Sequence, residues 1–247
     1  MAKYVIVDFR MREEEKKYLE SLGYQIINSG YNTELYDEIA AHVDISYVKV
    51  GNEIIVSPDK FVELNKILEY NVGKTELKKE YPSDIPYNVC IMGKKAIHNF
   101  KYTDPTLKEK LIKEGYELID VSQGYTKCSI AVIDDNSCIT SDIGIAKILM
   151  DKGIDVLFVY EPDIHLLKRT NPNEQFESRM YFEESDMQGF IGGAMVNLGE
   201  EIVLFGDLNK LLNKDKIVKF IESKSKKITE FKGLDIIDYG GIVTIEK

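Results

Sequence analysis

A short phrase that recurs along the chain constrains the fold more than any other feature. Its fullest copy runs from Gly189 to Asp207, where two apolar stretches flank a Gly-Glu pair that follows Leu198. A glycine at the first position of a two-residue loop suits a tight turn, so this copy predicts a β-hairpin. Variants of the phrase recur at Val50–Asp59, Met92–Ile97 and Ile133–Asp142. The recurrence predicts a fold built from one supersecondary unit used several times.

A second recurring pattern marks the ends of the expected helices. Charged amphipathic segments stop at Gly23, Gly115 and Gly153, and a short apolar segment follows each glycine at once. Glycine adopts the left-handed conformation after a helix without strain from a Cβ atom. The repeated unit is therefore expected to be a helix, a glycine, a strand and then a hairpin.

Five such units fit the chain, at about 11–59, 60–104, 105–142, 143–207 and 208–247. Their expected helices are Glu13–Leu22, Phe61–Tyr70, Leu107–Glu114, Ile145–Lys152 and Lys214–Ser223. Strands Tyr4–Asp8 and Gly241–Ile245 lack partners within their units. We expect these two strands to pair and to close a ring without free sheet edges. The prediction is a single α/β domain over residues 1–247, and the alternative is an ordinary α/β domain in which these patterns are generic.

Composition limits the possible partners. A formal charge of −10, from 32 basic and 42 acidic residues, argues against broad nucleic-acid binding, which needs a basic face. The sequence has no apolar run of membrane-spanning length, no signal-peptide pattern and no Walker A or GxGxxG motif. Three cysteines without regular spacing fit a reducing compartment better than a disulfide framework. We therefore expect a soluble cytoplasmic protein with no cofactor and no nucleic-acid or membrane partner.

The fourth unit is longer than the others. Its excess runs from Glu161 to Asp186, a polar segment that contains an Asn-Pro-Asn sequence. Such an insertion is usually a surface loop, and it is also where a lid would sit. The sequence leaves these two interpretations open.

Five pseudo-repeats of helix, strand and hairpin resemble the pentein fold of the guanidino-group-modifying enzymes. The Gly-Gly pairs of Phe190–Ala194 and Tyr239–Thr244 look like the Gly-Gly hairpins of that superfamily's fourth and fifth units. The resemblance covers nearly the whole chain and is strongest to a bacterial branch of unknown function. It implies a five-fold pseudo-symmetric α/β propeller.

The chain departs from these enzymes at the catalytic positions. They carry a nucleophilic cysteine after the last Gly-Gly pair, where this chain reads Ile242-Val243-Thr244 and has no cysteine beyond Cys138. They also carry a histidine that opens the fourth hairpin, where this chain has Phe190. Attack on an amidinium carbon needs the thiolate, so the standard mechanism does not carry over.

Aligning the hairpins on their turns places His42, Tyr125 and Phe190 at equivalent positions. A ring would then bring the beginnings of these hairpins to one end of its axis, where pentein active sites lie. The polar residues expected there are His42, Asp44, Asp84, Lys127, Cys128 and Asp238. The pairs Gly192-Gly193 and Gly240-Gly241 would let a ligand approach the backbone closely.

Three interpretations of Cys128 and His42 stay open. Cys128 could be a nucleophile whose thiolate is stabilised by Lys127 or His42, with Asp44 orienting the histidine. The two residues could instead line a binding pocket, or they could be ordinary buried residues, as we expect for Cys90 and Cys138. No metal site is expected, because a ligand set around His42 and Asp44 would need partners from distant units.

The leading functional hypothesis is an axial pocket for a small polar ligand that bears an amine or guanidine group. The pocket would comprise Asp84, Lys127, Gly192, Gly193 and Asp238, and Asp44, Asp84 and Asp238 would supply negative charge. Any catalysis, as a divergent C–N hydrolase, would use Cys128, His42 and Asp44. The alternative is a non-enzymatic protein that binds a protein partner through its outer surface, as does the pentein-fold ribosome anti-association factor of archaea and eukaryotes. An axis closed by Tyr125 and Phe190 would favour this alternative.

Overall fold

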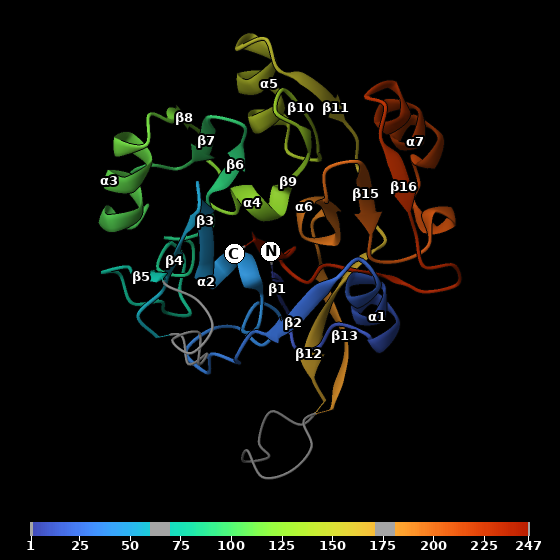
Figure 1. Ribbon diagram of the computed structural model, residues 1–247, viewed down its shortest axis with the longest axis horizontal. Coiled ribbons are helices and arrows are strands. Elements are labelled where there is room, and N and C mark those ends of the chain that lie inside the picture. The colour runs from blue at the N-terminus through green and yellow to red at the C-terminus, as the bar shows by residue number, and fades with distance from the viewer. Residues whose placement is uncertain (1, 60–69, 171–180, 247) are drawn as a thin grey trace.

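The computed structural model describes residues 2–59, 70–170 and 181–246. In these parts of the chain, four longer helices lie on the outside and three short ones lie near the middle (Figure 1). The longer helices are α1 (Glu13–Ser21), α3 (Pro105–Lys113), α5 (Ile143–Asp151) and α7 (Lys214–Ser223). The short ones are α2 (Val43–Ser46), α4 (Thr126–Ser129) and α6 (Ile191–Ala194), and a 3-10 turn, η2, spans Leu208–Lys210.

Five sheets in the described part of the chain share one topology. In each, the central strand pairs antiparallel with the strand before it in the chain and parallel with the strand after it, if the last strand is counted as preceding the first. In sheet order they are β3 (Tyr47–Val50), β4 (Glu53–Val56) and β5 (Tyr70–Val72); β6 (Cys90–Met92), β7 (Lys95–His98) and β8 (Glu117–Asp120); β9 (Ile130–Asp134), β10 (Ser137–Thr140) and β11 (Asp155–Phe158); β14 (Met195–Asn197), β15 (Glu201–Leu204) and β16 (Lys227–Thr229); and β18 (Val243–Glu246), β1 (Lys3–Val7) and β2 (Tyr24–Asn28). A sixth sheet also combines an antiparallel and a parallel pair but has a different strand order.

The two ends of the chain meet in one sheet. Strand β1 pairs antiparallel with β18, from Lys3 opposite Glu246 to Ile6 opposite Val243. This pairing confirms the prediction that the first and last strands complete each other. It also satisfies the backbone groups of two strands that would otherwise be unpaired edges.

The helices end and begin as their local chemistry dictates. Gly23, Gly115 and Gly153 follow α1, α3 and α5 with φ of 88°, 71° and 76°, which confirms the predicted left-handed ends. Helices α3 and α5 begin two residues earlier than predicted, because the carboxylates of Asp104 and Asp142 cap their first turns. The predicted helix Phe61–Tyr70 lies outside the described residues except for Tyr70, the first residue of β5.

Three hairpins do not begin as strands, contrary to prediction. The residues before β3, β9 and β14 form the short helices α2, α4 and α6. The pairing partners end at this point, since Tyr47 faces Val56, Ile130 faces Thr140 and Met195 faces Leu204. A chain that runs beyond its partner strand has no ladder bonds to make, and a helical turn satisfies part of its backbone internally.

The polar insertion is a hairpin and not a surface loop in its described part. Strands β12 (Ile164–Arg169) and β13 (Phe182–Gln188) pair antiparallel, and β12 pairs parallel with β17 (Ile236–Ile237). Lys168 stands opposite Glu183 across the two strands, and its ammonium also lies 3.8 Å from the carboxylate of Asp186. Residues 171–180 of the insertion lie outside the described residues.

The chain is a mixed α/β protein whose apolar side chains fill the space between the sheets and the outer helices. The boundaries proposed for the five units remain a prediction. Among the described residues, no helix combines the length and the apolar character that crossing a bilayer requires.

Candidate functional site

The three short helices bring the predicted polar residues together. His42, Tyr125 and Phe190 are the N-cap residues of α2, α4 and α6, so the three predicted equivalent positions occupy one structural role. The helices lie near the middle of the molecule (Figure 1). Their first residues therefore converge from three different sheets.

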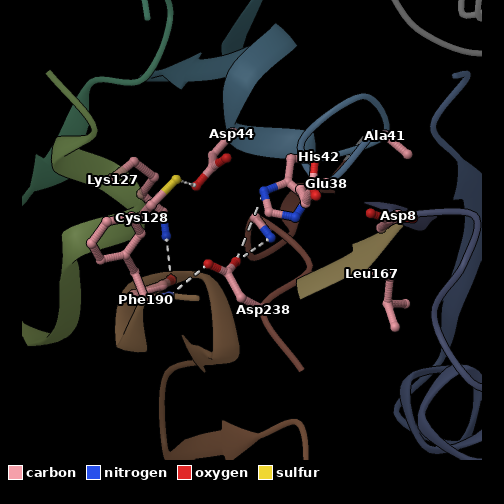
Figure 2. A network of polar contacts seen from close by, with 12 residues as sticks. Asp8, Glu38, Ala41, His42, Asp44, Lys127, Cys128, Leu167, Phe190 and Asp238 are labelled. Atoms are coloured by element: carbon pink, nitrogen blue, oxygen red, sulfur yellow. Dashed lines mark hydrogen bonds and ion pairs between the residues drawn. The ribbon is translucent and has the colours of Figure 1, made fainter. Parts of the chain in front are cut away.

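Four of the predicted residues form a buried polar cluster, which we call the central cluster: His42, Asp44, Cys128 and Asp238 (Figure 2). Each is exposed by 3% or less. The Sγ atom of Cys128 donates to Oδ2 of Asp44 over 3.0 Å, and Nδ1 of His42 lies 3.9 Å from Oδ1 of Asp238. Asp44 thus contacts the thiol, and His42 faces the second carboxylate.

Burial sets the protonation of the central cluster. It raises the pKa of Asp44 to about 6 and raises the pKa of Asp238, and it lowers the pKa of His42. Burial, together with the charge of Asp44, raises the pKa of the Cys128 thiol well above its usual value. At neutral pH Cys128 is therefore a thiol, whereas nucleophilic catalysis needs a thiolate. A catalytic role for Cys128, His42 and Asp44 stays a prediction.

Several polar atoms of the central cluster have no hydrogen-bond partner in the described part of the molecule. They are Nδ1 and Nε2 of His42 and Oδ1 of Asp44. Buried polar groups are nearly always paired, because removing them from water without a partner costs about 1–3 kcal/mol each. These atoms mark the cluster as a place where a further group can bind.

The glycines allow the protein to pack closely on itself in this conformation, and their role in binding a ligand stays a prediction. A Cβ atom on Gly193 would overlap the carboxylate of Asp238, and one on Gly192 would overlap the backbone of Lys127. A Cβ atom on Gly240 would lie 2.6 Å from that of His42. Protein atoms already occupy the space that these glycines leave.

Asp84 and Lys127 lie apart from the central cluster's contacts. Oδ2 of Asp84 accepts a hydrogen bond from the Tyr125 hydroxyl. The ammonium of Lys127 donates to the carbonyl of Gly192 over 3.0 Å, and the side chain lines a cavity of about 330 Å³ with Val196 and Ile242. Lys127 is thus hydrogen-bonded to backbone, and its positive charge opposes the rise in the pKa of Asp44 that burial causes.

Aromatic rings stand at this end of the short helices. The rings of Tyr125 and Phe190 stack with centroids 6.4 Å apart and an interplanar angle of 24°. The backbone N–H of Phe190 donates to Oδ2 of Asp238 over 2.8 Å. Phe190 is 36% exposed, so its ring contacts solvent. Asp238, a residue of the central cluster, is buried.

Beside Phe190 the surface is hollowed into a groove that sequence reasoning missed. Its volume is about 270 Å³. The groove is lined by Ser129, Ser141, Asp142, Tyr160, Glu161, Gln188, Gly189, Phe190 and Ile191. The Oγ atom of Ser129 is buried there without a partner among the described residues. The sequence signals were the residues that follow β10 and β11, because these two parallel strands end at the same end of the sheet at which β9 begins.

Arg10 is a further residue that the sequence analysis did not single out. Its guanidinium forms a buried ion pair with Asp8 over 2.6 Å. It also donates to the backbone carbonyls of Asp37, Glu38 and Leu167. Figure 2 shows Glu38 and Asp8 on the side of His42 away from Cys128, with Leu167 farther off. Arg10 therefore fastens the segment before α2 to β12 and fixes the backbone that leads to His42.

The fold is similar to that of solved guanidino-modifying enzymes, which have the pentein fold. A dimethylarginine dimethylaminohydrolase from Pseudomonas aeruginosa, complexed with citrulline, is 10% identical, with 99% of each chain covered and a TM-score of 0.54. An agmatine deiminase from C. jejuni is 11% identical, with 99% of this chain and 93% of that chain covered and a TM-score of 0.53. At such identities the likeness shows the fold alone.

The chain itself belongs to DUF6873, a family of unknown function. The model of that family matches residues 6–171 and 182–243. No curated protein sequence matches the chain.

Proposed function

We propose that this chain binds a small polar ligand that bears an amine or guanidine group. The ligand sits in the groove beside Phe190, next to the central cluster. The observation that carries the proposal is the composition of this groove. It combines the carboxylates of Asp142 and Glu161 with two aromatic rings and an unpartnered buried hydroxyl, that of Ser129.

These groups suit a cation that also donates hydrogen bonds. The rings of Tyr160 and Phe190 are 56% and 36% exposed, so a cation can lie against their faces. No lining residue of the groove is a lysine or arginine, so its carboxylates have no cationic neighbour among the described lining residues. A volume of about 270 Å³ fits a ligand at the small end of the usual range.

The axial carboxylates take a different part from the one expected. Asp44, Asp84 and Asp238 are buried, and Asp238 is bound to the backbone of Phe190 and Gly240. We propose that the three carboxylates contribute to the electrostatic potential of the site, and that Asp238 holds the backbone of Phe190 in place. Direct contact with a ligand falls to Asp142, Tyr160 and Phe190.

We also infer that the sheets form a closed five-unit ring. Five sheets of one topology and the pairing of β1 with β18 support this inference. The groove then lies at the end of the axis where α4 and α6 begin. This is the end at which the polar ligand was expected.

The catalytic alternative, a hydrolase that uses Cys128, has less support. The thiol donates to Asp44 and its pKa is raised, so the nucleophilic form is disfavoured. The other alternative is a binding protein that uses its outer surface. It gains support from the stacked rings of Tyr125 and Phe190, which lie at the N-terminal ends of α4 and α6.

Calorimetric titration with matched ligands tests the proposal. Agmatine and arginine carry a guanidinium, whereas citrulline carries an uncharged ureido group of nearly the same shape. We expect saturable binding of agmatine or arginine, and citrulline at least about tenfold weaker, because it lacks the charge that Asp142 and the rings recognise. Equal binding of citrulline, or binding of none of the three, would reject the cationic-ligand proposal and leave the outer-surface alternative.

A further inference from the structure

The central cluster contains three side chains of the kinds that bind transition metals. His42 and Asp44 come from the start of α2, and Cys128 comes from α4. One ligand atom from each of the three lies within 4.8 Å of the other two. The sequence analysis expected no metal site, because further ligands would have to come from distant units. Cys128 is a candidate ligand from such a unit.

The hydrogen bonding of this trio is incomplete. The Cys128 thiol and Asp44 Oδ2 share one proton over 3.0 Å. Oδ1 of Asp44 and both ring nitrogens of His42 have no hydrogen-bond partner among the residues that the structure describes, although Nδ1 of His42 faces Asp238 at 3.9 Å. All three side chains are almost fully buried, so solvent does not compensate for the missing bonds. A cation bound between them would satisfy an oxygen, a nitrogen and the sulfur at once.

We propose that His42, Asp44 and Cys128 bind a divalent transition-metal ion, with zinc as the ion that the ligand set fits best. Thiolate and imidazole favour zinc over the oxygen-seeking ions magnesium and calcium. In a tetrahedral zinc site the ligand atoms are roughly 3.3–3.8 Å apart, which follows from zinc–ligand bonds of about 2.0–2.3 Å. Closing from 4.8 Å therefore needs shifts of about 1 Å, within the reach of side-chain rotation.

Neighbouring groups support the three ligands. The Asn88 side-chain amide donates to the Cys128 sulfur over 3.1 Å and to the Asp44 carbonyl over 3.3 Å. This amide holds the two ligand-bearing helices in register. Asp238, 3.9 Å from His42, is fixed by two backbone N–H groups and places a second negative charge beside the ion. Outer groups of this type orient metal ligands and increase affinity.

Metal binding would release the thiol proton to solvent and form a metal–thiolate bond, with no change of oxidation state. The ion would join α2 to α4, whose ligands Asp44 and Cys128 lie 84 positions apart in the sequence. The site is buried, so we assign the ion a structural role in the centre of the molecule. The proposal does not depend on the groove beside Phe190, because none of the three ligands lines it.

Cobalt(II) titration of the chelator-treated full chain tests this site. Tetrahedral cobalt bound to a thiolate gives intense visible bands and a near-ultraviolet thiolate-to-cobalt charge-transfer band. We expect both bands to saturate at one ion per chain, and zinc to displace cobalt. Cys128→Ser should abolish the charge-transfer band, and His42→Gln should weaken binding at least about 100-fold.

Two variants serve as matched controls. Cys138→Ala removes another buried thiol, and His165→Gln removes the histidine of a second, more exposed group with Glu184 and Asp235. Both should keep the wild-type band and affinity. An unchanged band in Cys128→Ser, loss of binding in His165→Gln alone, or no ion retained by wild type would each overturn the proposal. If Cys128→Ser fails to fold, the wild-type stoichiometry and charge-transfer band decide.

Discussion

The thiol of Cys128 donates a hydrogen bond to the carboxylate of Asp44 over 3.0 Å, across 84 positions of sequence. This contact joins α4 to α2 in the middle of the molecule, where both residues are buried. A thiol that donates to a carboxylate is held in its protonated form. The contact therefore disfavours the thiolate form of Cys128 that nucleophilic catalysis would need.

All three thiols should resist alkylation in the folded protein at neutral pH. Burial raises the pKa of Cys90 to about 12 and raises the pKa of Cys128 and Cys138 above the usual range. We expect iodoacetamide to modify none of them within the time that it modifies a free thiol, as read by mass spectrometry. In denaturant all three should react. Rapid alkylation of Cys128 alone in the native protein would instead support the catalytic alternative.

Asp44→Asn should change the pH dependence of stability. The folded-state pKa of Asp44 is raised from 3.8 to about 6 by burial, so the folded state favours the protonated carboxyl. Its contribution to stability is fully present below pH 3.8 and is lost as the pH rises through about 6. The variant has no such loss, so its unfolding free energy relative to that of wild type should rise by roughly 2 kcal/mol between pH 4 and 7.

Urea denaturation with chelator present measures this difference. Asp155→Asn, at an exposed end of β11, is the control and should show no comparable trend. A constant difference between Asp44→Asn and wild type across this pH range would contradict the assignment.

Gly193→Ala should destabilise the protein severely. The added methyl group would overlap the Asp238 carboxylate, which cannot move without losing its bonds to Phe190 and Gly240. Overpacking of this kind costs about 1–3 kcal/mol or more, and a lost bond to a buried charge adds to it. Thermal denaturation should show the loss, whereas Gly144→Ala in helix α5 should stay within about 1 kcal/mol of wild type. A stable Gly193→Ala protein would mean that Asp238 is not fixed as described.

Arg10→Lys should cost about 3–5 kcal/mol of unfolding free energy. Lysine keeps the charge beside Asp8 but cannot donate to the carbonyls of Asp37, Glu38 and Leu167 together. Arg169→Lys, in the more exposed ion pair with Asp37, is the control and should cost less than about 1 kcal/mol. Equal effects of the two substitutions would show that Arg10 is not the residue that fastens β12.

Local patterns predicted the fold where the chain makes its own structure. Helix α7 begins and ends at Lys214 and Ser223 as predicted, because its apolar residues recur at helical spacing. The glycine after each of α1, α3 and α5 also allowed the helix end to be predicted from the sequence. Glycine adopts the left-handed conformation found there without the strain that a Cβ atom causes.

The remaining features depend on tertiary structure. Strand β13 reads Phe-Glu-Glu-Ser-Asp-Met-Gln, which looks like a loop until β12 pairs with it. The helical turn at α2 follows from the end of its partner strand, which lies ten or more residues away. The contact between Asp44 and Cys128 depends on how two sheets that are far apart in the sequence are arranged in space. The residues of the central cluster could therefore be predicted from the sequence, but the contacts between them could not.

The most direct test of the proposed function compares agmatine binding by Asp142→Asn and Asp155→Asn. Both substitutions remove one carboxylate, and asparagine can still cap α5 at position 142. Only Asp142 lines the groove, whereas Asp155 lies at the opposite end of β11 from Tyr160. We expect calorimetry to show binding about tenfold weaker in Asp142→Asn, or about 1.4 kcal/mol, and unchanged in Asp155→Asn. Equal affinities of both variants and wild type would contradict a cation site in this groove.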